Sequence, residues 1–126
     1  MNYVYYNPNP LGILVGDCVI RALAKALKYD WEKVYADLVL QGFVMKDLPS
    51  SNNVWGTYLR EHGFKVRPLP DTCPACYTVD KFANEHRRGT YVVATGTHVV
   101  AVEDGDYYDS WDSGNEVITY YFVKED

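Results

Sequence analysis

The chain has 126 residues, a formal net charge of −5 at neutral pH and 23% charged residues. That length fits one domain around one hydrophobic core, so we expect residues 1–126 to form a single domain. An acidic chain lacks the basic face that binding to nucleic-acid phosphates requires. No apolar run approaches the roughly 20 residues that span a bilayer. We therefore expect neither nucleic acid nor a membrane as a partner.

The first two thirds of the chain are predicted to be mainly helical. Residues 1–15 are rich in tyrosine, asparagine and proline and are expected to form extended chain with turns. Apolar residues at helical spacing predict a helix over residues 17–28 and a second one that starts after Asp30 and ends near Gly42. A third helix is predicted from Asn52 or Asn53 to residue 62, a short strand over residues 64–67 and a fourth helix over residues 79–88.

The last third of the chain changes to strands rich in valine, tyrosine and threonine. The pair Asp104-Gly105 predicts a tight hairpin turn between the second and third of these strands. A helical segment followed by an antiparallel sheet is typical of the α+β class. The four predicted strands span residues 90–94, 98–103, 106–111 and 117–123.

Cys18 is the first candidate functional residue, at the junction of a loop and the first helix. Asp17 is the predicted N-cap, so Cys18 would occupy the first helical position. Unpaired N–H groups and the helix dipole at that position stabilise a thiolate. A free cysteine is more often a small buried hydrophobe, so the assignment depends on its neighbours in the fold.

A histidine and a carboxylate in the strand region are the candidate partners. Alternation puts His98, Val100 and Val102 on one face of a strand. The hairpin brings Asp109 approximately opposite His98, where it would accept the Nδ1–H of the imidazole and fix its tautomer. A slip of one residue would turn Asp109 to the other face. Asp112 is then the substitute, followed by Asn115.

Three segments together resemble a known family. Residues 16–18 (Gly-Asp-Cys), 97–102 (Thr-His-Val-Val-Ala-Val) and 109–111 (Asp-Ser-Trp) are similar to the nucleophile, base and orienting motifs of papain-like cysteine peptidases. The likeness is to compact bacterial and phage types, such as those that process double-glycine leader peptides. It implies a papain-like fold, with N-terminal helices packed on a C-terminal antiparallel sheet. It also implies a peptide or protein substrate.

The resemblance has one departure, in the group that stabilises the oxyanion. Papain relatives carry a glutamine about six residues before the nucleophile, where this chain has Gly12, and Gln41 is its only glutamine. The backbone N–H of Cys18 can serve as one donor, and Asn7 is the candidate for a side-chain donor.

The implied function is thiol-dependent hydrolysis of an amide through an acyl-enzyme, with Cys18, His98 and Asp109 as catalytic residues. Two alternatives stay open: an inactive papain-like domain that binds a peptide or protein, and a transglutaminase-like acyltransferase. The oligomeric state is also open.

The remaining cysteines and the N-terminus bear on compartment and cofactor. Three cysteines disfavour a secreted disulfide framework, and the N-terminus lacks the pattern of a signal peptide. We therefore expect a cytoplasmic protein. Cys73 and Cys76 have the spacing of half a zinc site without a second pair of ligands. They are predicted to be two free thiols in a loop, and no metal or other cofactor is expected.

Overall fold

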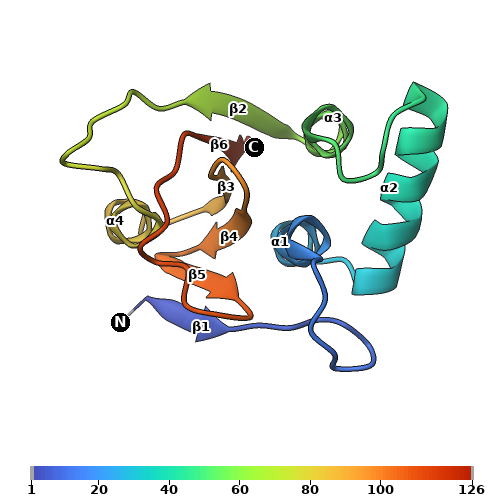
Figure 1. Cartoon of the computed structure of the whole chain (residues 1–126), viewed down its shortest axis with the longest axis horizontal. Helices are drawn as coiled ribbons and strands as arrows, with labels where there is room; N and C mark the ends of the chain where they lie inside the picture. Colours follow the sequence, from blue (N-terminus) through green and yellow to red (C-terminus); the bar gives the residue numbers. More distant parts are fainter. Residues whose placement is uncertain (1, 126) are drawn as a thin grey trace.

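Helices lie on both faces of one six-stranded sheet in the computed structural model, which describes residues 2–125 (Figure 1). The α+β class is thereby confirmed. The helices are α1 (Cys18–Leu27), α2 (Trp31–Met45), α3 (Asn52–Glu61) and α4 (Val79–Glu85). The strands are β1 (Tyr3–Tyr5), β2 (Phe64–Pro68), β3 (Thr90–Ala94), β4 (Val99–Glu103), β5 (Asp106–Asp109) and β6 (Tyr120–Lys124).

The sheet is mixed, with the strand order β1-β5-β4-β3-β6-β2. The prediction of an antiparallel sheet made only from the C-terminal part is wrong, because β1 pairs in parallel with β5 and β2 pairs with β6. Both added strands cover an edge of the C-terminal strands, whose unpaired backbone groups need partners. The Tyr3 and Tyr107 rings, 5.7 Å apart, pack side by side where β1 joins the sheet.

Each face of the sheet has its own apolar cluster. The helices α1, α2 and α3 lie on one side and α4 lies on the other (Figure 1). The larger cluster joins the first three helices to the sheet and includes Leu23, Val34, Trp55, Leu59 and Phe122. The smaller cluster packs α4 on the opposite face and includes Phe82, Val93, Val100 and Val102.

The hairpin between β4 and β5 forms as predicted. Asp104 and Gly105 both have positive φ, 51° and 89°, as a two-residue turn of this kind requires. The register pairs Ala101 with Tyr108. One step further along that register, Asp109 lies across from Val100 and diagonal to His98. The prediction that Asp109 lies opposite His98 is therefore off by two residues.

The end of α2 differs from its prediction. The helix continues to Met45 and ends at Lys46, which has a φ of 60°. Gly42 lies inside the helix, where an added Cβ would be 2.7 Å from the carbonyl oxygen of Asp47. The glycine is therefore a close-contact position that lets the following loop fold back on the helix, and it is not the C′ residue.

The loop between β2 and α4 contains a disulfide between Cys73 and Cys76. The prediction of two free thiols there is wrong. It was argued from the compartment, which says nothing about the loop conformation that brings the two sulfurs together. Cys18 is consequently the one free thiol of the three cysteines.

Helix length and composition also bear on membranes. None of the helices within residues 2–125 is long and apolar enough to cross a bilayer.

Candidate functional site

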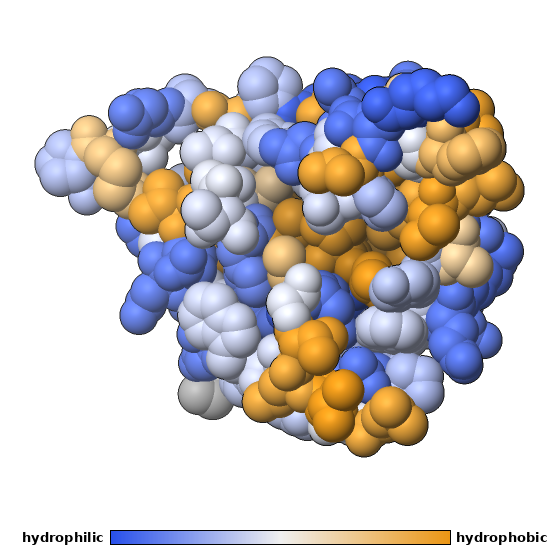
Figure 2. Space-filling view, turned by 45° about the vertical axis from the view of Figure 1, so that its right-hand side comes forward, coloured by the Kyte–Doolittle hydropathy of each residue, from blue (hydrophilic) through white to orange (hydrophobic). Residues whose placement is uncertain are grey.

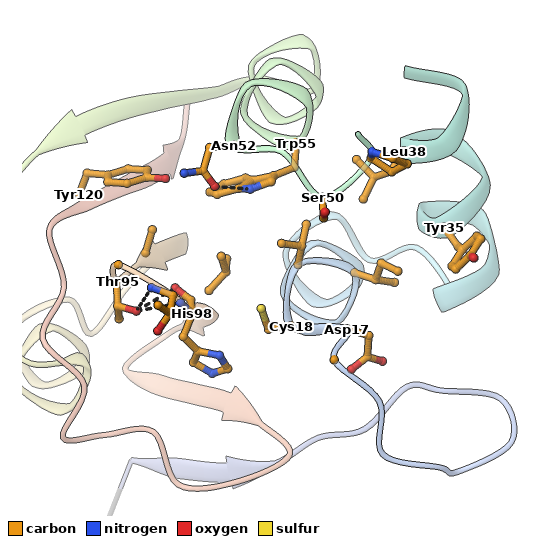
Figure 3. Close-up of a pocket in the computed structure, with 18 of the residues that line it drawn as sticks. Asp17, Cys18, Tyr35, Leu38, Ser50, Asn52, Trp55, Thr95, His98 and Tyr120 are labelled. Carbon is orange, nitrogen blue, oxygen red and sulfur yellow. Dashed lines mark hydrogen bonds between the residues drawn. The ribbon is translucent and has the colours of Figure 1, made fainter. Parts of the chain in front are cut away.

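Cys18 is the first residue of α1 and is half-buried at the edge of a cavity of about 480 Å³. The cavity lies between α1, the α2–α3 region and the turn before β4 (Figure 3). As the first helical residue, Cys18 has a backbone N–H with no partner inside the helix. Apolar side chains dominate the lining, among them Val19, Ile20, Leu38, Val39, Trp55 and Val99.

His98 lines the same cavity, next to Cys18 (Figure 3). A tight turn holds it: the N–H of Thr95 donates to the His98 carbonyl at 2.8 Å, and the Thr95 hydroxyl accepts from the His98 N–H at 2.9 Å. The Trp111 ring packs against the imidazole with centroids 4.9 Å apart.

The predicted common face of His98, Val100 and Val102 is not observed. The strand β4 begins at Val99, so His98 belongs to the preceding turn and is free of the strand's alternation. Val100 and Val102 pack in the α4 cluster, whereas His98 lines the cavity next to α1.

Asp109 is the partner of His98, at the end of β5. Its carboxylate is fully buried, and Oδ2 lies 2.6 Å from Nε2 of His98. The prediction that Nδ1 would meet Asp109 is wrong: register arithmetic locates a residue but does not decide which ring nitrogen it meets. With Nε2 engaged, Nδ1 is the ring nitrogen that remains for Cys18, which lines the same cavity.

The alternative carboxylate and amide lie elsewhere. Asp112 accepts hydrogen bonds from the Tyr107 hydroxyl and from the Gly114 N–H at 3.0 Å. Asp112 and Asn115 line a separate cavity near Asn2.

A buried ion-pair network joins the site to α1, and the sequence reasoning missed it. Arg21 bridges the carboxylates of Asp17 and Asp109, and the hydroxyl of Ser113 donates to Asp109 Oδ2 at 2.6 Å. An arginine among the apolar residues of α1, four positions after an aspartate, was the available signal.

Asp17 therefore has a different role from the predicted N-cap. Its side chain makes no capping hydrogen bond. Its carboxylate instead accepts from Arg21 and, at 2.8 Å, from the indole N–H of Trp31. The carboxylate is used for tertiary contacts, so the N–H groups of the first turn stay free of it.

The electrostatics of the three residues favour a charged pair. Burial alone would raise the pKa of Cys18, but His98, the backbone N–H of Val99 and the positive charge of Arg21 together lower that pKa. Burial would lower the pKa of His98, whereas the hydrogen bonds and negative charges of Asp109 and Cys18 raise it to about 9. Burial likewise opposes ionisation of Asp109, and its hydrogen bonds with His98 and Ser113 lower its pKa.

The candidate oxyanion donor is not brought to the site. The Asn7 amide donates to the Ile13 carbonyl at 3.2 Å, and its oxygen accepts from the Asn9 N–H at 3.3 Å. Asn52 is the amide residue that lines the cavity, on the wall with Trp55, whose indole N–H donates to its oxygen at 3.0 Å (Figure 3).

No three or more histidine, cysteine, aspartate or glutamate side chains within residues 2–125 are grouped to hold a metal ion. Cys18 and His98 supply a thiol and an imidazole to the lining of the cavity.

The surface near the cavity is rich in apolar side chains (Figure 2). One group lies on α2 and includes Tyr35, Val39, Leu40, Phe43 and Val44. A second group lies on the loop before α1 and includes Leu11, Ile13, Leu14 and Val15.

Comparison with protein-family models, curated proteins and solved structures finds no significant match for the chain.

Proposed function

We propose that the chain is a papain-like cysteine hydrolase that cleaves a peptide or related amide bond through an acyl-enzyme. In this proposal Cys18 is the nucleophile, His98 is the base and acid, and Asp109 orients the imidazole. The observation that carries it is a His98 ring held by Asp109 at 2.6 Å through one nitrogen while the other is left for Cys18. The three residues come from separate elements, at the start of α1, before β4 and at the end of β5.

The chemistry follows from a thiolate next to an imidazolium. The Cys18 sulfur attacks the carbonyl carbon, a C–S bond forms, and the negative charge moves to the carbonyl oxygen. The free N–H of Cys18 in the first turn of α1 donates to that oxygen. His98 then protonates the leaving amine as the C–N bond breaks.

Deacylation reverses the roles. His98 takes a proton from water, and the resulting hydroxide attacks the thioester carbonyl. The C–S bond breaks, the product leaves as a carboxylic acid, and Cys18 returns as a thiolate next to the imidazolium. Asp109 stays ionised throughout, because Arg21 and Ser113 stabilise its charge.

The cavity suggests what is bound next to the scissile bond. Apolar side chains dominate its lining, and its two ionisable carboxylate and imidazole groups, on Asp17 and His98, are already paired. An apolar side chain or acyl group of the substrate would bury surface there without stranding a charge.

Acylation of Cys18 tests the proposal. The protein is mixed with the p-nitrophenyl ester of an N-acetylated apolar amino acid, and intact mass and nitrophenol release are followed together. We expect a burst of about one equivalent, a mass increase on Cys18 and slow turnover, with corresponding peptide amides cleaved at the same bond. Cys18→Ala should abolish the burst, and His98→Ala should slow it at pH 6 by about 10²- to 10⁴-fold.

The remaining outcomes separate the alternatives. Turnover that appears only when a primary amine is added, with amide product, would indicate an acyltransferase. Acylation no faster than that of a free thiol, with equal rates for wild type and His98→Ala, would contradict the catalytic proposal and leave the binding function.

A further inference from the structure

One buried arginine joins the helix that carries Cys18 to the carboxylate that holds His98. Arg21 lies one turn after Cys18 on α1 and is 4% exposed. Its Nε and Nη2 lie 3.1 and 2.9 Å from Oδ1 of Asp109. Its Nη1 contacts the carboxylate of Asp17, the residue that precedes α1.

The contacts divide the two oxygens of Asp109. Oδ1 faces Arg21 and accepts from the backbone N–H of Ser110 at 2.8 Å. Oδ2 accepts from His98 and from the Ser113 hydroxyl, each at 2.6 Å. Two donors of one guanidinium on Oδ1 restrict rotation of the carboxylate about its bond to Cβ, and that restriction keeps Oδ2 directed at the imidazole.

We infer that Arg21 is a positioning residue of the Cys18–His98 site, which acts by fixing both the orientation and the charge of Asp109. The inference rests on the proposed function and extends it to a residue outside the three-residue motif. The helix α1 thus carries both Cys18 and Arg21, the cation that holds the carboxylate partner of His98.

The charges around the site give the expected direction of change. Arg21 lowers the pKa of Cys18 and of Asp109 by its positive charge. Asp17 partly neutralises that charge from the other side. From β1, the Tyr3 hydroxyl donates to the Asp109 carbonyl at 3.2 Å, and burial raises the pKa of Tyr3, so it stays neutral over the working range.

Two substitutions should therefore move the reactivity of Cys18 in opposite directions. Arg21→Met removes the cation, so the rise of alkylation rate with pH should move to higher pH by about one unit or more, which is about tenfold slower alkylation at pH 6. Asp17→Asn leaves the positive charge of Arg21 less neutralised, so the alkylation rate of Cys18 should rise at a lower pH than in wild type. Lys28→Met, which removes an exposed cation from the far end of α1, is the matched control.

Iodoacetamide alkylation of unreduced protein, followed by intact mass from pH 4 to 10, provides the measurement. A role limited to holding the fold together would lower the stability of Arg21→Met and Asp17→Asn alike and leave both pH profiles at the wild-type position. That result would overturn the inference. If Arg21→Met does not fold by circular dichroism, Asp17→Asn decides alone: a profile that is unmoved or shifted to higher pH contradicts it.

The wild-type pH profile of alkylation distinguishes a failure of the proposed function from a failure of the role of Arg21. A wild-type profile at the pH of an ordinary thiol would count against the proposed function itself. A wild-type profile at low pH that neither variant moves overturns only the role of Arg21.

Discussion

His98 is the residue that joins the proposed nucleophile to a buried carboxylate, because one ring nitrogen contacts Asp109 and the ring lines the same cavity as Cys18. Burial opposes its charge, and two anionic neighbours restore it. Such a ring keeps its proton at neutral pH and lowers the pKa of Cys18. His98 is therefore protonated at a pH at which burial alone would leave a histidine neutral.

Substitution of the carboxylate tests this balance. Asp109→Asn keeps the size of the side chain and removes its charge, so the pKa of His98 should fall and hydrolysis at neutral pH should drop by about 10²- to 10⁴-fold. The variant should also lose about 3–5 kcal/mol of stability, because Arg21 is left as a buried charge with one partner fewer. Ester turnover and urea denaturation measure the two effects.

Asp112→Asn is the matched control for that variant. Asp112 accepts from the Tyr107 hydroxyl, away from His98, so its substitution should leave the pH profile of Cys18 alkylation unmoved. Equal losses of activity in the two variants would contradict the assignment of Asp109.

The helix α1 shows where sequence reasoning succeeded and where it stopped. Its amphipathic spacing predicted the start at Cys18, and the Asp-Gly hairpin brought Asp109 to the neighbourhood of His98. Both predictions depend on local sequence patterns. The contacts of Arg21 depend on how β5 packs against α1, which no local pattern encodes, and for the same reason the sequence predicts only a capping role for Asp17.

Other errors have the same origin. The pairing of β1 with β5 joins the two ends of the chain and has no signal in either segment. The true end of α2 depends on the contact of Gly42 with the loop that follows, so a rule about glycine at helix ends gave the wrong boundary.

The role of Gly42 is itself testable. Alanine at an open helical position stabilises by about 1 kcal/mol relative to glycine. Here the added methyl would meet backbone atoms of residues 47–49, so Gly42→Ala should destabilise by about 1–3 kcal/mol. The midpoint of urea denaturation measures the change. Gly96→Ala, which has no neighbour within 4 Å, is the control, and a stabilised Gly42→Ala would refute the close contact.

The sheet as a whole separates two packed faces and leaves the site where β4 begins and β5 ends, next to the start of α1. Protonation at the site is therefore linked to the stability of the entire domain. Between about pH 6.5 and 8.5 the unfolded chain holds a neutral His98 and a protonated Cys18. In the folded chain the pKa of His98 is raised to about 9 and the pKa of Cys18 is lowered, so the two changes in bound protons on unfolding oppose each other.

The linkage predicts different pH dependences for wild type and Cys18→Ala. In Cys18→Ala the folded pKa of His98 remains raised by Asp109 alone, so its stabilising contribution is full below pH 6.5 and declines as the pH rises through that pKa. The difference in unfolding free energy between wild type and variant should therefore increase by about 1 kcal/mol from pH 6 to 9. Urea denaturation at four pH values measures it, and parallel curves would contradict a charged pair.

The pH profile of Cys18 alkylation in wild type and His98→Ala tests the charged thiol–imidazole pair most directly. The disulfide between Cys73 and Cys76 leaves iodoacetamide a single target without reduction. We expect the alkylation rate of wild type to rise at a pH well below the range in which an ordinary thiol begins to react. His98→Ala should need a pH at least one unit higher to reach the same fraction of its maximal rate. Coincident profiles for the two proteins, both rising near pH 8.5, would contradict the pair and the hydrolase proposal with it.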